Sequence, residues 1–195
     1  MRSFSACGLS VLACPLSAPG FMPQIFGVAD EHSFDAPVPS DAQILQTVEQ
    51  AFAECRRPEH FTDYTHCEEC AEHDEVLRSR DAHSIRLEDV GNPGWDPICF
   101  TSPEGFAYYL PGLARLALAE PVEPQGWYGV QLLFHLCHDG RQNRRLLACT
   151  PEQRHAVTAF LRHLIETRAA LADSYCCTDN LFQALEIWSD EIHLG

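Results

Sequence analysis

Ten consecutive residues, from Thr65 to Asp74, concentrate the reactive side chains of this chain. Their sequence, THCEECAEHD, holds two thiols, two imidazoles and four acids. Two Cys three residues apart, with a His on either side, can bind a soft metal ion or act as a redox dithiol. A hydrophobic core requires neither arrangement, so this cluster is the first candidate for a functional site.

A helix is predicted over this cluster, and helix geometry limits which side chains can share one ion. Thr65 and Glu68 form a capping pattern, which predicts that the helix starts at Thr65 and continues toward Leu77. At 100° per residue, one face of the helix then presents His66, Cys67, Cys70 and His73. His66 and His73 differ by an axial rise of about 10 Å, so they cannot reach the same ion.

A tetrahedral zinc site would therefore need ligands from a second element. His135 and His138 are the best donors, because they are three residues apart and lie on one side of another predicted helix. The resulting site would be closed and structural, or open with a bound water that attacks a substrate. Zinc is the expected cofactor, and its predicted ligands are drawn from Cys67, Cys70, His73, His66, His135 and His138.

Two other interpretations of the cluster stay open. In the first, Cys67 and Cys70 are half-buried thiols, and the histidines belong to the surface of an acidic helix. In the second, the two thiols form a redox dithiol, with Cys67 in the first helical turn, where the helix dipole stabilises a thiolate. The neighbouring acids oppose a thiolate, because their charge raises the pKa of a nearby thiol, whereas they favour a bound cation.

The composition excludes several classes of protein. All 13 basic residues are Arg, so the chain has no Lys for a PLP Schiff base or for the P-loop of a Walker-type NTPase. The formal net charge is −15, which disfavours binding to nucleic acid or to an anionic membrane surface. This charge favours a basic protein as the partner, and the sequence does not set the oligomeric state.

Cysteine usage favours a cytoplasmic protein. Ten Cys in 195 residues, irregularly spaced, fall short of the roughly 8–10% that marks a small disulfide-rich scaffold. The first residues match a lipoprotein-type signal ending near Cys14 only poorly, so export is the minor alternative. Residues 1–39 are rich in Pro, Gly and Ser and are predicted to be a flexible or leader-like tail, with Met22 as an alternative start.

Residues 40–195 are predicted to form one helical domain. Capping patterns and apolar spacing predict further helices over about 41–55, 102–117, 127–138, 150–171 and 180–188, of which 150–171 is the longest. Residues 85–87 are expected to be a short extended segment and residues 91–97 a loop. The fold class is therefore mainly α, a single compact domain of about five to six helices with at most a small extended element, preceded by a flexible N-terminal tail.

Two further regions contain chemically useful side chains. The binding candidates are Trp95, Asp96, Tyr108 and Tyr109, although aromatic residues at such spacing also fit a core. The basic run of residues 139–145 could bind a phosphate or carboxylate, but a solvated turn that pairs with nearby acids is the favoured interpretation.

The motifs in these regions resemble a bacterial family of uncharacterised proteins. The resemblance rests on HCxEC-x2-HDE at residues 66–75, on GNPGWDPICF at residues 91–100 and on YYLP at residues 108–111. It covers roughly residues 45–118 and implies a bacterial, cytosolic protein. It carries over no catalytic residue, because that family has no established activity.

Two functions from different classes follow from these observations. The favoured one is a small acidic binding protein, immunity- or antitoxin-like, in which Cys67, Cys70 and His73 hold a structural zinc. The alternative is an enzyme, either a metal-dependent hydrolase with Glu69 or Asp74 as general base or a CxxC dithiol redox protein.

Overall fold

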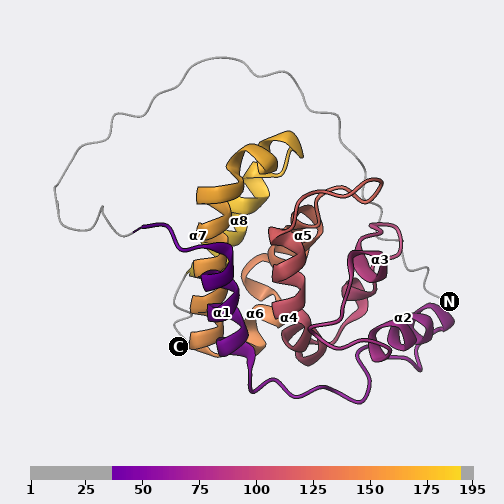
Figure 1. Ribbon diagram of the computed structural model, residues 1–195. Coiled ribbons are helices and arrows are strands. Elements are labelled where there is room, and N and C mark those ends of the chain that lie inside the picture. The colour runs from indigo at the N-terminus through magenta and orange to yellow at the C-terminus, as the bar shows by residue number, and fades with distance from the viewer. Residues whose placement is uncertain (1–36, 190–195) are drawn as a thin grey trace.

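Every regular element in residues 37–189, the part of the chain that the computed structural model describes, is helical (Figure 1). In chain order the elements are α1 (Asp41–Phe52), α2 (Glu68–Arg78), α3 (Leu87–Val90), the 3-10 helix η1 (Pro97–Phe100), α4 (Pro103–Leu118), α5 (Gly129–Cys137), the 3-10 helix η2 (Gly140–Gln142), α6 (Arg144–Ala148), α7 (Pro151–Ser174) and α8 (Thr178–Ser189). The predicted mainly α class is confirmed.

Most predicted helix starts are confirmed by their caps. The Ser40 hydroxyl accepts the Gln43 N–H, and the Gln43 side chain accepts the Ser40 N–H at 2.8 Å, which closes the capping box of α1. Thr150 and Gln153 repeat this arrangement at the start of α7, the longest helix. The predicted tail comprises residues 1–39, of which 1–36 lie outside the described part, as does the segment that the export alternative concerns; residues 37–39 are exposed and belong to no helix.

Three sequence-based expectations are corrected. Helix α2 starts at Glu68, because Cys67 rather than Thr65 occupies the cap position. Residues 85–87 form no strand, since α3 begins at Leu87. The one bridge between extended residues in the described part of the chain joins Val122 to Gly126. Part of the basic run 139–145 enters α6, whose first residue is Arg144 and whose cap is Asn143.

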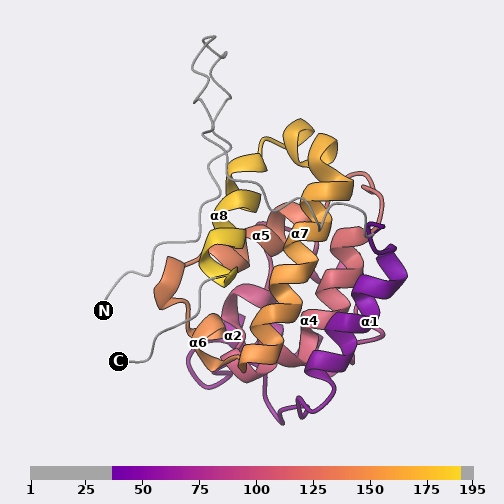
Figure 2. The same cartoon turned by 90° about the vertical axis from the view of Figure 1, so that its left-hand side faces the viewer.

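The core forms around α4, which packs against α1, α5 and α6, while α7 packs against α1 and α8 (Figures 1 and 2). The apolar residues of α4 recur on more than one side of the helix, as expected for a central helix. Leu113 is 0% exposed, so its truncation to Ala would cost about 2–5 kcal/mol. None of the described helices is long and apolar enough to span a bilayer.

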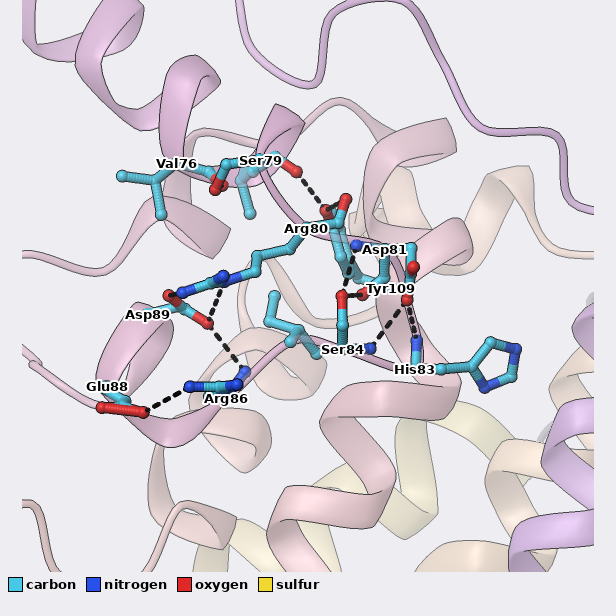
Figure 3. Close-up of polar contacts among 12 residues, drawn as sticks. Val76, Ser79, Arg80, Asp81, His83, Ser84, Arg86, Glu88, Asp89 and Tyr109 are labelled. Atoms are coloured by element: carbon cyan, nitrogen blue, oxygen red, sulfur yellow. Dashed lines mark hydrogen bonds and ion pairs between the residues drawn. The ribbon is translucent and has the colours of Figure 1, made fainter.

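Helix α2 lies at one side of this core and is joined to it through buried hydrogen bonds (Figures 1 and 3). The Tyr109 hydroxyl of α4 donates to the Leu77 carbonyl and, at 3.0 Å, to the Arg80 carbonyl, so it fixes the end of α2. Arg80 then binds the Asp89 carboxylate of α3 through its Nε and one terminal nitrogen, at 2.9–3.1 Å. The candidate ligands on α2 therefore sit on an element whose far end is anchored.

Candidate functional site

The structure brings together three of the predicted metal ligands at the start of α2. The ligand atoms of His66, Cys67 and Cys70 all lie within 4.8 Å of one another. The two Sγ atoms are 3.4 Å apart, and the Cys70 Sγ is 3.7 Å from the His66 Nδ1. We refer to these three residues as the CCH group.

The cap of α2 creates this arrangement. Cys67 is extended, with φ −162° and ψ 169°, and its Sγ accepts the Cys70 N–H at 3.5 Å, as a Ser or Asp cap would. This bond turns the Cys67 sulfur toward the first helical turn, where Cys70 lies. Cys67 and His66 are exposed and Cys70 is 7% exposed, so the group opens to solvent on one side.

Two of the three separations in the CCH group, from Cys70 to Cys67 and from Cys70 to His66, fit a tetrahedral zinc ion. With Zn–S near 2.3 Å and Zn–N near 2.1 Å, tetrahedral angles place two sulfurs about 3.8 Å apart and a sulfur about 3.6 Å from a nitrogen. The observed separations of 3.4 Å and 3.7 Å need shifts of only a few tenths of an ångström. Within residues 37–189 no fourth Cys, His, Asp or Glu joins the group, so the fourth position would be left to water or another molecule.

Electrostatics make the two thiols unequal. The pKa of Cys67 lies below its usual value, because the Cys70 N–H and then His66 stabilise its thiolate. Burial, followed by the neighbouring Cys67 sulfur, raises the pKa of Cys70 to about 11. Cys67 is therefore the better nucleophile and the first of the two to lose its proton to a metal.

His73 lies apart from the CCH group. Its ring is 0% exposed and sits between Trp95 and Phe100, with both ring centroids 4.5 Å away. Neither ring nitrogen makes a hydrogen bond, and Nε2 is 3.7 Å from a Glu69 carboxylate oxygen. Burial lowers the pKa of His73, so the ring is neutral at pH 7.

His135 and His138 also lie outside the CCH group. The His135 ring donates from Nε2 to the Asp96 Oδ2 at 2.8 Å, and Asp96, Cys99 and His135 form a second group whose ligand atoms lie within 4.8 Å of one another. His138 is exposed and pairs with Asp139 at 3.1 Å. The predicted pairing of α2 thiols with these histidines is thus replaced by two separate groups, each of which can offer three ligands.

The second group is part of a buried polar cluster between η1 and α5. Asp96 caps η1 by accepting the Ile98 N–H at 2.9 Å, and its other oxygen also accepts from the Gln131 side chain at 3.0 Å. Cys99 and Tyr128 were not singled out from the sequence as site residues, and Arg145 was considered only as part of the basic run 139–145. Cys99 and Asp96 do fall within the motif at residues 91–100, which is the one sequence signal that could have pointed to this cluster.

The remaining sequence-predicted residues have varied environments. Trp95 is 41% exposed, Tyr108 is half-buried, and Tyr109 is buried as the anchor of α2. Asp74, a candidate general base, accepts the N–H groups of Phe61 and Thr62 at 2.6 Å and 3.2 Å, and it also bonds His60 at 2.7 Å. Asp74 is 2% exposed, and its hydrogen bonds join α2 to the preceding loop.

The fold and the two groups define a small all-helical domain with Cys/His and Asp/Cys/His sites on separate elements. The chain belongs to the family described as "Family of unknown function (DUF6714)", which matches residues 40–191. This confirms the resemblance to a family without an established activity and extends it to α8. Comparisons with curated proteins and with solved structures gave no match.

Proposed function

We propose that this protein is an acidic zinc-binding interaction module, immunity- or antitoxin-like in kind, whose partner is a basic protein. The observation that carries the proposal is the clustering of the His66, Cys67 and Cys70 ligand atoms within 4.8 Å. Zn²⁺ bound there would neutralise the thiolates and tie the loop before α2 to its first turn. The ion would thereby order this end of α2 for binding.

The surroundings of the CCH group support a basic partner. Four acids close to it in sequence are exposed: Asp63, Glu68, Glu69 and Glu72. Trp95 and Phe100, which are 41% and 36% exposed, both contact the His73 ring of α2. Tyr64, which is 44% exposed, stacks on the His60 ring, and His60 bonds Asp74 of α2. Aromatic residues within a charged rim are typical of protein interfaces, and the negative rim favours Arg and Lys on the partner.

A metal-dependent hydrolase is less well supported by the same geometry. Three protein ligands with an open fourth position are compatible with a catalytic zinc. Asp74, however, is committed to backbone N–H groups, and Glu69 is directed at His73. Of the two bases considered from the sequence, neither is directed at the CCH group.

The dithiol function is the second candidate, and one specific observation favours it. An exposed Cys67 with a lowered pKa stands 3.4 Å from a buried Cys70 whose pKa is about 11. This is the asymmetry that a dithiol needs, because the first sulfur attacks a substrate disulfide and the second resolves the mixed disulfide. Zinc and disulfide use the same two sulfurs, so they exclude one another.

The decisive experiment is elemental mass spectrometry of the full chain purified under reducing conditions. We expect near-stoichiometric zinc in the wild type and in Cys176→Ser, an exposed cysteine far along the chain, but no zinc in Cys67→Ser/Cys70→Ser. A wild type without zinc that instead forms a Cys67–Cys70 disulfide would replace the zinc function with the dithiol function.

The partner class is tested by charge. Chemical cross-linking in the native cells would compare the wild type with Glu68→Gln/Glu69→Gln/Glu72→Gln, whose zinc content and circular dichroism are checked first. We expect the wild type to be cross-linked to proteins of net positive charge and the variant not to be. We also expect added salt to weaken the same cross-linking in a lysate of these cells. Equal capture by both would contradict the acidic interface.

A further inference from the structure

The cluster around Cys99 holds a combination of groups that the proposed zinc function does not use. The ligand atoms of Asp96, Cys99 and His135 lie within 4.8 Å of one another. Asp96 is 5% and His135 1% exposed, whereas Cys99 is half-buried and so lies at the outer edge of the cluster. A half-buried thiol beside a buried imidazole and a buried carboxylate supplies the components of an activated cysteine.

Hydrogen bonds fix the roles of the imidazole and the carboxylate. Because His135 donates from Nε2 to Asp96, its Nδ1 carries the lone pair that can accept a proton. Asp96 accepts three N–H groups in all, from His135, Gln131 and Ile98. These bonds take three of the roughly four acceptor sites of the carboxylate, so the geometry favours a hydrogen-bonded His–Asp pair over a second zinc site.

Two further side chains place hydrogen-bond donors and positive charge in the cluster. Arg145 stacks over the Phe106 ring at 4.5 Å and interacts electrostatically with Cys99 and Asp96. The Tyr128 hydroxyl is fully buried, has no hydrogen-bond partner and interacts electrostatically with Asp96, Arg145 and Cys99. A buried hydroxyl without a partner is costly, and it is available to bind an oxygen atom brought into the cluster.

We propose that Cys99 is a reactive thiol that is oxidised by hydroperoxides, with His135 as its base, Asp96 as the group that orients His135, and Arg145 and Tyr128 as donors to the peroxide. The half-buried position of Cys99 admits a small reactant better than a peptide. Arg145 stabilises the thiolate, and a protonated Tyr128 donates to the oxygen on which charge develops.

The reaction balances as a two-electron oxidation of sulfur. The Cys99 proton passes to His135, the thiolate attacks the hydrogen-bearing oxygen of the hydroperoxide, an S–O bond forms, and the O–O bond breaks. The departing alkoxide or hydroxide takes the proton from His135 and leaves as alcohol or water. The peroxide is reduced, and Cys99 becomes a sulfenic acid.

The test compares two cysteines within the same wild-type chain. Cys137 is also half-buried, but its Sγ donates to the Asn180 carbonyl at 3.2 Å and burial raises its pKa to about 11. Reduced full-length protein would receive less than one equivalent of hydrogen peroxide at pH 7 with dimedone present, followed by peptide mass spectrometry. We expect dimedone on Cys99 at a rate at least about tenfold above that on Cys137, because thiolate is the reactive form.

Variants then separate a reactive site from chance exposure. Cys67→Ser/Cys70→Ser removes the competing thiols and should leave the rate constant of Cys99 labelling unchanged. Asp96→Asn should lower this rate constant and shift its pH profile upward. Equal labelling of Cys99 and Cys137 in the wild type would overturn the proposal without any variant. A zinc ion retained by Cys67→Ser/Cys70→Ser and lost by Cys99→Ser would also overturn it, and it would overturn the CCH zinc site as well. Equal labelling of Cys99 and Cys137 leaves the CCH zinc site unaffected, so the two proposals can fail separately.

Discussion

The two Cys/His groups of this protein are built from similar residues but suit different chemistry. The CCH group lies within five residues of chain, is open to solvent, and has only weak bonds among its own members. The Asp96–Cys99–His135 group is assembled from two elements, and strong hydrogen bonds occupy its carboxylate. Metal ligands need free lone pairs. The two groups therefore differ in exposure and in existing hydrogen bonds rather than in residue type, and this difference suits one to zinc binding and the other to thiol activation.

The comparison implies that the two groups contribute unequally to the free energy of unfolding, and Asp96→Ala is the variant with the largest expected effect. Removing the carboxylate leaves the buried His135 and Gln131 side chains without their acceptor, so we expect a loss of about 3–5 kcal/mol in the free energy of unfolding. His66→Ala, in the exposed group, should change metal-free stability by less than about 0.5 kcal/mol. Urea unfolding measures both, and similar losses would remove the distinction between the two groups.

Zinc should stabilise the protein through the CCH group and not through the Asp96–Cys99–His135 group. At about 100 times its dissociation constant, Zn²⁺ adds about 2.7 kcal/mol to the free energy of unfolding, or about 5–10 °C in Tm for a domain of this size. We expect this shift in the wild type and in Cys99→Ser, and its absence in Cys67→Ser/Cys70→Ser. A thermal scan with and without zinc checks it, and a shift lost with Cys99 instead would assign the metal to the buried group.

The anchoring of α2 predicts a smaller effect. Tyr109→Phe removes the hydroxyl that donates to the Leu77 and Arg80 carbonyls, so we expect a loss of about 1–2 kcal/mol. Tyr108→Phe, at the half-buried neighbouring position, is the matched control and should stay within about 0.5 kcal/mol. Chemical denaturation gives both values, and zinc affinity of Tyr109→Phe shows how far the anchor orders the CCH group.

The pH dependence of the free energy of unfolding gives the smallest expected effect. Burial lowers the pKa of His73 and of His135 in the folded protein below the ordinary value of 6.5. The unfolded chain therefore binds more protons as pH falls through about 6.5, and stability is lost there. We expect a steeper loss between pH 7.5 and 5.5 in the wild type than in His73→Phe, which keeps a ring between Trp95 and Phe100. Equal slopes would show that His73 does not titrate on unfolding.

Local sequence patterns predicted most of the fold. The caps at Ser40 and Thr150 place α1 and α7, because each depends only on residues three apart. The cap of α2 was placed two residues too early, at Thr65, because the Thr65 and Glu68 pattern fits a cap that Cys67 in fact provides. The short helices α3 and α6 were missed because packing, not propensity, stabilises elements of this length.

The sequence by itself determined that His66, Cys67 and Cys70 would be near neighbours, since they fall within five residues of chain, whereas the cap that turns the Cys67 sulfur toward Cys70 was decided by the structure. It could not determine that His135, 39 residues from Asp96, would bond that carboxylate, or that His73 would be enclosed by Trp95 and Phe100. Those contacts depend on how η1 packs against α2 and α5. Only burial of the shared core fixes that arrangement, because no local hydrogen bond or spacing specifies it.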